Sequence, residues 1–386
     1  MKNLYLSKLY QASTTKDTYQ MIGLMSGTAL DGLDIALVEL GQGKPLKLLA
    51  FKTYDYDPAI RKEILSTMKG KLAQASAMNF KLGSLYSRLV NDFLKINQLN
   101  PQNILAIASH GQTVYHKNGS SSYQIGEADV IAKNTNIPVI YDFRSGDIAV
   151  GGTGAPLVAY LDYYLSQHNK NLNYAFQNLG GIGNVTFIDK QKNIQAFDTG
   201  PANILSNIFT SLATEQRQFF DVDAKLASTG NINQELLSYM LAHRFFKRDA
   251  PKSTGHEEFG ELYSQELLTK FPNIKLVDFI RTSLRLTAIS IKQAYQKYAP
   301  ANLNLVILSG GGVCNQLLVN DIKEQLAQKG RAIKLFSEEF YLADEAKEAI
   351  CFALLGWHRI CGIKTNFKTV TGAKRQVSLG KIALPD

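Results

Sequence analysis

Hydrophobic positions along this chain follow two different periods in turn. Short apolar runs, such as residues 20–25 and 104–108, have the length and composition of buried strands. Between such runs apolar residues recur every three or four positions and predict helices. They do so at Met78, Leu82, Leu85, Leu89, Phe93 and Ile96, and again at Leu284, Ala288, Ile291 and Tyr295. Strands that alternate with helices along the whole chain predict an α/β fold.

The predicted elements occur in the same order twice. A meander of three strands comes first, and a helical region and two further strands follow. The meanders begin near residues 19 and 173, and the later strands are residues 104–111 and 137–143 in the first half, and 303–312 and 332–337 in the second. Sequence identity between the copies is low, so the repeat lies in the pattern. A duplicated plan predicts two similar domains, and ligands commonly bind in the cleft between such domains.

The length of 386 residues suits two domains rather than one compact core. We expect an N-terminal extension over residues 1–18, domain I over residues 19–138 together with 366–386, and domain II over residues 139–365. The C-terminal segment is assigned to domain I because its apolar run, VSLGKIAL, is expected to return to the first sheet.

Composition narrows the classes of partner. Lys and Arg exceed Asp and Glu by 42 to 33, and the net charge of +9 favours an anionic ligand. These basic residues are scattered and do not alternate with aromatic residues, so we expect no nucleic-acid partner. No apolar run reaches 18 residues, so we expect no membrane partner. The polar N-terminus and the three cysteines (Cys314, Cys351 and Cys361), which lack metal-type spacing, indicate a cytoplasmic protein whose thiols are buried.

The connection after the first predicted strand is rich in small and acidic residues. Its sequence, GLMSGTALDGLD, includes Gly23, Ser26, Gly27, Thr28, Asp31, Gly32 and Asp34. Glycines let a ligand approach the backbone closely, and free N–H groups with hydroxyls suit phosphate. Because carboxylates repel phosphate, we expect Asp31 and Asp34 to act through a hydrated Mg²⁺. A long solvated turn with aspartate as turn former explains the segment equally well.

The second half carries a matching glycine turn and a carboxylate. Residues 178–184, NLGGIGN, follow the equivalent strand and would hold a polyphosphate from the other side. Asp198 lies one strand later, in residues 197–203, FDTGPAN. A carboxylate at a strand end beside a phosphate site can take a proton from water or a hydroxyl group. The alternative is that Asp198 only caps the helix that follows.

Three consecutive glycines, Gly310, Gly311 and Gly312, come after a buried strand. They allow adenine or ribose to lie against the backbone, although a tight strand-to-helix turn would also explain them. The chain contains neither the dinucleotide-binding pattern nor the Walker phosphate-binding motif. An ATP site would therefore be formed without a P-loop.

Two histidines and one loop are further candidates. His110 and His116 lie six residues apart, which is not a usual zinc spacing, so we expect them to form hydrogen bonds within the site or to a substrate. Residues 251–259, PKSTGHEEF, are polar and could form a lid.

Two charged residues allow a structural and a functional interpretation. Arg144 could bind a carboxylate or phosphate through two hydrogen bonds, but a salt bridge to Asp142 or Asp147 is equally consistent with the local sequence. Glu348 lies in the first turn of a predicted helix, where its charge favours the helix dipole.

Together these segments resemble the anhydro-N-acetylmuramic acid kinases, a family within the actin, sugar-kinase and Hsp70 ATPase superfamily. The resemblance extends from about Tyr19 to the C-terminal VSLGKIAL and rests on eight motifs in the family's order. They are GLMSGTALDGLD, SHGQT, DFRSGDIAVGGTGAPL, NLGGIGN, FDTGPANIL, PKSTGHEEF, SGGG and DEAKEA. The resemblance implies two actin-like (ribonuclease H-like) domains, a homodimer, and a kinase of peptidoglycan recycling. Such a kinase opens the 1,6-anhydro ring of its amino sugar and phosphorylates O6 with ATP.

The resemblance also implies roles for particular residues. Asp198 would activate water for attack at the anomeric carbon, and Arg144 and Glu348 would contact the sugar. An arginine suits the lactyl carboxylate that marks a muramic acid. The implied cofactors are ATP and Mg²⁺, and the implied ATP-binding residues are Gly27, Thr28, Ala29, Leu30, Asp31, Gly32, Leu33, Asp34, Gly181, Gly310, Gly311 and Gly312.

Several positions depart from the family's usual pattern. Ala29 replaces a usual Ser, and Ala202 and Ala224 replace usual glycines. Such alanines matter only where φ is positive or a ligand lies close. Because Asp198 and the other expected acids are retained, we expect an active enzyme. Two alternatives stay open: a kinase or ATPase of the same superfamily with another acceptor, and a non-catalytic actin-like nucleotide-binding protein.

Overall fold

The chain divides into two compact units in the computed structural model, which describes residues 4–27 and 30–386. Unit 1 comprises Met1–Leu161 and Ala346–Asp386, and unit 2 comprises Asp162–Glu345. This division differs from the expected boundaries. The strand at residues 139–141 pairs within the sheet of unit 1, and the helix at residues 347–360 packs on that sheet. Both segments therefore belong to unit 1, although the expected boundaries place them in domain II.

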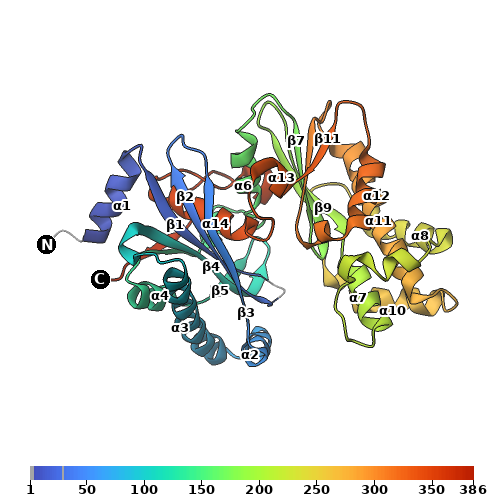
Figure 1. Cartoon of the computed structure of the whole chain (residues 1–386), viewed down its shortest axis with the longest axis horizontal. Coiled ribbons are helices and arrows are strands. Elements are labelled where there is room, and N and C mark those ends of the chain that lie inside the picture. The colour runs from blue at the N-terminus through green and yellow to red at the C-terminus, as the bar shows by residue number, and fades with distance from the viewer. Residues whose placement is uncertain (1–3, 28–29) are drawn as a thin grey trace. The chain divides into compact units, whose positions relative to one another are not determined.

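Unit 1 is built on a seven-stranded sheet with the order β12–β6–β4–β1–β2–β3, and β5 pairs with β4 outside this path (Figure 1). β1, β2 and β3 form an antiparallel meander, β4 and β6 join it in parallel, and β12 pairs antiparallel with β6. The C-terminal apolar run therefore returns to the first sheet, as expected. The strands are β1 (Thr18–Ser26), β2 (Gly32–Gly41), β3 (Lys47–Asp55), β4 (Ile104–Lys117), β5 (Ser121–Ile125), β6 (Val139–Tyr141) and β12 (Lys381–Ala383).

One face of this sheet packs against the predicted amphipathic helix. Ile22 and Leu24 of β1 share a buried cluster with Leu82 and Tyr86 of α3 (Leu72–Ile96). The period of three and four is confirmed over most of α3, but Ile96 at its end is 52% exposed. α2 (Pro58–Met68) and α4 (Ala128–Thr135) flank α3 (Figure 1).

The other face packs against α14 (Lys347–Ile360). The ring of Trp357 is buried and stacks on Tyr19 of β1. α1 (Leu4–Thr14) packs on α14 in turn, with Leu9 and Ala12 buried. Residues 4–14, expected to belong to a frayed extension, therefore form a helix, because an apolar stripe on them has a partner. The remaining short helices of this unit are η1 (Pro101–Asn103), α5 (Ser145–Ile148) and α15 (Lys368–Thr371), and α6 (Ala159–Ser166) crosses into unit 2.

Unit 2 repeats the same sheet plan. Its five strands have the order β11–β10–β7–β8–β9, with β7, β8 and β9 antiparallel and β10 and β11 parallel to β7. This is the arrangement of β6–β4–β1–β2–β3 in unit 1, so the predicted duplication is confirmed. The strands are β7 (Tyr174–Leu179), β8 (Ile182–Ile188), β9 (Ile194–Pro201), β10 (Leu305–Ser309) and β11 (Ala332–Leu335).

Helices complete the core of unit 2 (Figure 1). α11 (Leu276–Tyr298) is the central helix, and the predicted apolar positions Leu284, Ala288, Ile291 and Tyr295 are all buried. The others are α7 (Ile204–Ala213), α8 (Gln234–Leu241), α9 (His256–Phe259), α10 (Glu261–Lys270), α12 (Gln316–Leu326) and α13 (Phe336–Phe340), with the short helices η2 (Val222–Ala224), η3 (Ala227–Thr229), η4 (Arg244–Lys247) and η5 (Gly311–Cys314).

Two further features concern hydropathy and the cysteines. Within residues 4–27 and 30–386, no helix has the length and hydropathy needed to cross a membrane. Cys351 is buried as expected, whereas Cys314 is exposed and Cys361 partly exposed.

Ala224, one of the departures from the family pattern, lies where the backbone conformation disfavours a side chain. Ala224 has a φ of 55° and Asp223 a φ of 54°, so two consecutive residues adopt the left-handed conformation. A Cβ in that conformation meets the following carbonyl group, and glycine avoids this cost. Ala202, by contrast, does not have a positive φ, and it is 1% exposed.

We expect Ala224→Gly to raise the free energy of unfolding by roughly 0.5 kcal/mol, because relief of backbone strain exceeds the combined cost of losing the buried Ala224 methyl group and of the entropy that glycine adds to the unfolded chain. Urea unfolding of the wild type and the variant at one pH measures the change. Ala202→Gly is the matched control and should lower stability, because it removes a buried methyl group without relieving strain. A destabilised Ala224→Gly variant would contradict the argument.

Candidate active site

The turn after β1 rests on a buried polar network. Ser26 Oγ donates to Gln112 Oε1 at 2.5 Å and lies 2.7 Å from the Tyr56 hydroxyl, which lies 2.9 Å from the Tyr86 hydroxyl. Gln112 Nε2 donates to the carbonyl oxygen of Gly27 at 3.2 Å. All four side chains are buried. Because buried polar groups are costly unless they are paired, this network fixes the start of the turn.

Only part of the predicted phosphate turn can offer side chains to a ligand. Leu30 and Leu33 are buried in the core and could contact a nucleotide only through their backbones. A Cβ on Gly32 would lie 2.4 Å from the carbonyl oxygen of Tyr54, so strand packing already requires this glycine. Thr28 and Ala29 lie outside the described residues.

Three acids of unit 1 interact electrostatically. Asp31 is exposed, and Asp34 accepts a hydrogen bond from Thr53 Oγ1 at 2.6 Å. Glu348, in the first turn of α14, is open to solvent yet closely surrounded by protein atoms. This reduced hydration and the charge of Asp34 raise the pKa of Glu348, while Arg144 acts in the opposite direction. The acids from the predicted phosphate turn and from the predicted sugar contact therefore belong to one cluster with Arg144.

Arg144 is oriented by His110. Arg144 Nε and Nη2 lie 3.2 and 2.9 Å from His110 Nε2, so a neutral imidazole accepts from the guanidinium group. Burial and the charge of Arg144 lower the pKa of His110 to about 3. Burial lowers the pKa of Arg144 to about 10, with Glu348 opposing the change, so the guanidinium group stays charged at neutral pH. The expectation that His110 forms hydrogen bonds within the site is confirmed.

The salt-bridge alternatives for Arg144 are not realised among the described residues. Asp142 pairs with Lys381 at 2.6 Å. Asp147 is fully buried and accepts hydrogen bonds from Gly154 N and the side chains of Asn366 and Thr371. Arg144 is therefore held by the neutral His110, and its salt-bridge alternatives are wrong.

Asp198, the candidate base of unit 2, is partly buried. It lies within β9 and not at the strand end expected from the sequence, because the strand continues beyond it. It pairs with Asn184 of β8 next to a bulge, and it does not cap the following helix, whose N-cap is Asn203. Asp198 Oδ2 accepts a hydrogen bond from Thr254 N at 2.9 Å. Burial raises the pKa of Asp198 to about 6 against the opposing hydrogen bond from Thr254, and the charge of Glu257 adds to the rise. Asp198 thus remains ionised near neutral pH and binds a proton more readily than an ordinary aspartate does.

The glycine turns of unit 2 fall into two groups. A Cβ on Gly310 would lie 2.5 Å from Asn178 Oδ1, and one on Gly312 would lie 2.7 Å from Leu179 Cβ, so packing against the end of β7 requires both glycines. No heavy atom lies within 4 Å of a Cβ built on Gly181 or Gly311. These two backbones therefore have open space beside them, which suits a bound nucleotide.

The described acids do not form a metal site by themselves. Among residues 4–27 and 30–386, no group of three or more His, Cys, Asp or Glu side chains has an arrangement that could hold a metal ion. His116 lies within hydrogen-bond distance of Ser122 and Asn118.

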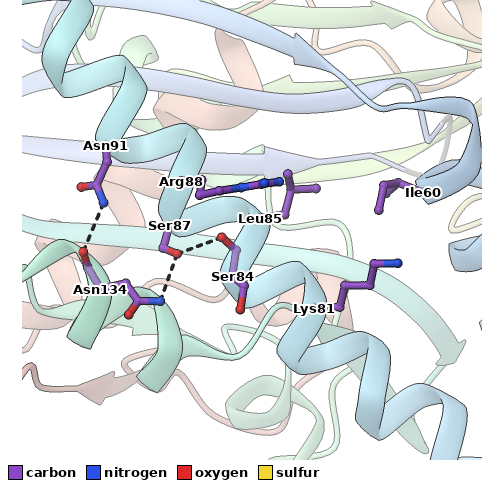
Figure 2. Close-up of a pocket in the computed structure, with 8 residues that line it drawn as sticks. All are labelled: Ile60, Lys81, Ser84, Leu85, Ser87, Arg88, Asn91 and Asn134. Carbon is purple, nitrogen blue, oxygen red and sulfur yellow. Dashed lines mark hydrogen bonds between the residues drawn. The ribbon is translucent and has the colours of Figure 1, made fainter.

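A separate hollow of about 690 Å³ lies over α3 of unit 1 (Figure 2). None of the predicted site residues lines it. Its polar groups largely bind one another: Asn91 donates to the backbone of Asn134, and the Asn134 side chain donates to Ser87. Lys81 pairs with Glu63 at 2.6 Å. We therefore assign this hollow no role.

Sequence reasoning missed several supporting residues. Gln112 lies in the SHGQT motif, but only its contacts with Ser26 and Gly27 reveal its role. Thr254 and Glu258 lie in the segment expected to form a lid, and the structure instead ties that segment to Asp198.

Comparisons with known proteins identify one family of enzymes. The sequence model for the anhydro-N-acetylmuramic acid kinases matches residues 19–385. The anhydro-N-acetylmuramic acid kinase of Caldanaerobacter subterraneus subsp. tengcongensis is 39% identical, with 96% of this chain and 98% of that protein aligned. The enzyme of the same name from Clostridioides difficile is 38% identical, with 94% and 97% aligned.

Solved structures resemble the chain more distantly. Component A of (R)-2-hydroxyglutaryl-CoA dehydratase from Acidaminococcus fermentans is 15% identical, with a TM-score of 0.43 over 89% of this chain and 99% of that one. The activator of 2-hydroxyisocaproyl-CoA dehydratase from Clostridium difficile is 11% identical, with a TM-score of 0.42 over 88% and 95%.

We expect the imidazole of His110 to remain neutral, with its proton on Nδ1, down to about pH 4, because burial and Arg144 both oppose a second proton. Nitrogen chemical shifts of labelled histidine, followed by NMR from pH 7 to pH 4.5, test this. In Arg144→Ala the pKa of His110 should rise but stay below 6.5, since burial persists. Titration of His110 near 6.5 in the wild type would contradict the assignment.

Proposed function

The chain belongs to the anhydro-N-acetylmuramic acid kinase family, and on that premise we propose that it opens the 1,6-anhydro ring of anhydro-N-acetylmuramic acid and phosphorylates O6 with ATP. The observation that supports the chemistry best is Asp198. One oxygen of this carboxylate is held by Thr254 N, and burial raises its pKa to about 6. Such a group can take a proton from water at neutral pH.

The proposed reaction balances with one water and one ATP. Asp198 accepts a proton from the water, the water oxygen bonds to C1, and the C1–O6 bond breaks with its electron pair left on O6. O6 then bonds to the γ-phosphorus of ATP, the bond from that phosphorus to the β,γ-bridging oxygen breaks, and ADP leaves. The products are N-acetylmuramic acid 6-phosphate, ADP and the proton on Asp198.

We propose that ATP is held by backbone groups of two turns and by few side chains. The open backbones at Gly181 and Gly311 support this in unit 2. In unit 1 the turn from Gly27 to Asp34 would contribute N–H groups, with Asp31 and Asp34 contacting Mg²⁺ through water. Mg²⁺ would supply charge neutralisation of the phosphate oxygens.

We propose that Arg144 recognises the lactyl carboxylate of the sugar. The guanidinium group of Arg144 stays charged, and its Nε and Nη2 atoms lie within hydrogen-bond distance of His110 Nε2. The charge of Glu348 also acts on Arg144. Its remaining N–H groups suit a carboxylate better than a hydroxyl. Glu348, next to this guanidinium group, would accept hydrogen bonds from sugar hydroxyls. We place the enzyme in the cytoplasm as a homodimer, where it would act on an amino sugar released from peptidoglycan.

We expect Asp198→Asn to lower sugar-dependent ADP release by about 10²-fold or more, because the amide does not accept the proton. ADP formation with Mg-ATP is measured with and without 1,6-anhydro-N-acetylmuramic acid. Asp189→Asn, on an exposed turn of the same unit, is the control and should retain turnover. Full turnover in Asp198→Asn would remove this residue from the mechanism, and no sugar-dependent turnover in the wild type would refute the acceptor.

The same substitution should stabilise the fold above neutral pH. The pKa of Asp198 rises from 3.8 to about 6 on folding, so folding disfavours the charged form. The resulting loss of folding free energy is absent below about pH 3.8, grows between pH 3.8 and about pH 6, and is complete above about pH 6. Asp198→Asn should therefore raise the free energy of unfolding by roughly 1 to 3 kcal/mol at pH 8 and by little at pH 4. Urea unfolding at the two pH values measures this difference.

We expect Arg144→Ala to remove discrimination for the lactyl group. A charge-assisted pair contributes roughly 1.5 to 3 kcal/mol, so kcat/KM for 1,6-anhydro-N-acetylmuramic acid should fall by about 10- to 150-fold. For 1,6-anhydro-N-acetylglucosamine, which lacks the carboxylate, the change should stay within about threefold. Equal losses for both sugars would show that Arg144 does not recognise the lactyl carboxylate.

A further inference from the structure

One short segment of unit 2 holds Asp198 at two atoms. Asp198 N donates to the carbonyl oxygen of Lys252 at 3.0 Å, and Thr254 N donates to Asp198 Oδ2 at 2.9 Å. Among the described residues, no hydrogen bond reaches Asp198 Oδ1. Thr254 therefore determines which oxygen of the carboxylate is engaged and which is available.

Thr254 is itself fixed by a buried acid. Thr254 Oγ1 donates to Glu258 Oε2 at 2.9 Å. Arg248 donates to both oxygens of Glu258, from Nη1 to Oε2 at 2.8 Å, and Arg244 Nε lies 3.3 Å from Oε1. The side chain of Glu258 is 7% exposed. Burial alone would raise the pKa of Glu258, but hydrogen bonds from Arg248 and Thr254 outweigh it and hold the pKa below its usual value.

The backbone that carries Glu258 is anchored in the core. Phe259, the next residue, is fully buried and contacts the rings of His243, Phe245 and Tyr263. The Glu258 carboxylate is therefore a fixed acceptor, and Thr254 is attached to it at the far end of a short loop.

We propose that Glu258 is a positioning residue for Asp198: it holds the Thr254 hydroxyl, so that the Thr254 N–H points at Asp198 Oδ2 and Oδ1 is left to take the proton from water. This inference rests on the proposed role of Asp198. Other groups near Asp198 are Lys252 and Glu257, and Asn184 lies opposite on β8. The hydrogen bond from Thr254 and the charge of Lys252 lower the pKa of Asp198, whereas burial and Glu257 raise it.

The test removes the hydroxyl group of Thr254 and keeps its backbone N–H. Thr254→Val keeps the shape and the N–H but removes the hydrogen bond to Glu258, and it leaves the ion pairs of Glu258 with Arg248 and Arg244 intact. In this variant the hydrogen bond from Thr254 N to Asp198 should weaken, so the pKa of Asp198 should rise by about one unit. The acid limb of the kcat/KM profile should then move to higher pH by the same amount. At pH 6 this lowers kcat/KM by about fivefold, while at pH 8.5 the change should stay within about twofold.

Two variants serve as controls, and a third repeats the test at Glu258. Thr254→Ser keeps the hydroxyl and should restore the wild-type profile. Glu257→Gln removes a charge that raises the pKa of Asp198, so its acid limb should move down. Glu258→Ala should shift the limb in the same direction as Thr254→Val, with folding monitored by thermal unfolding.

An acid limb that stays in place in Thr254→Val overturns the proposal. So does a loss of kcat/KM by the same factor at every pH, since that is the effect of a merely structural contact. Failure of the proposed function is a different result, because Asp198→Asn would then keep its turnover whatever Thr254→Val does.

Discussion

A close backbone contact between β1 and α14 determines where the acids of unit 1 lie. A Cβ on Gly23 would lie 1.8 Å from the carbonyl oxygen of Ala349, and one on Gly356 would lie 2.7 Å from Ala108 Cβ. The helix can approach the sheet this closely only because both residues lack a side chain. Glu348 directly precedes Ala349, so the contact places its carboxylate where the charges of Asp34 and Arg144 reach it. Gly23, expected to admit a ligand, instead fixes the position of an acid.

Asp198 depends on a balance between two opposing effects. Burial raises the pKa of the carboxyl group, and a carboxylic acid that holds its proton is no base. The hydrogen bond from Thr254 N acts in the other direction, and the resulting pKa is about 6. A fully solvated aspartate would be ionised but a weak base, with a pKa of 3.8. Partial burial with one fixed donor therefore gives a group that is both ionised and basic.

The fold could be predicted further than the site. Hydrophobic periods are local, so they identified α3, α11 and the repeated order of strands, and the topology of the two sheets confirms the duplication. The boundaries depend on contacts between distant segments. Nothing in the sequence near residue 350 shows that α14 packs on the sheet of unit 1.

The same distinction applies to the residues of the site. Motifs pointed to Asp198, Arg144 and Glu348, although the local sequence also allowed each of them a structural role. Gln112 and Glu258 went unnoticed, because each acts on a functional segment through another residue or a backbone atom. Such a role follows from tertiary contacts and leaves no periodic signal along the chain.

The duplicated plan places different side chains on corresponding strands. In unit 1, the residue that follows β3 is Tyr56, whose hydroxyl is buried against Ser26 and supports the turn after β1. In unit 2, the corresponding strand β9 carries Asp198 within it, and this carboxylate is tied to a loop and keeps one oxygen available. The order of the strands is the same in both units, so the difference between a supporting role and the proposed chemical one lies in the side chain and in the partners that surround it.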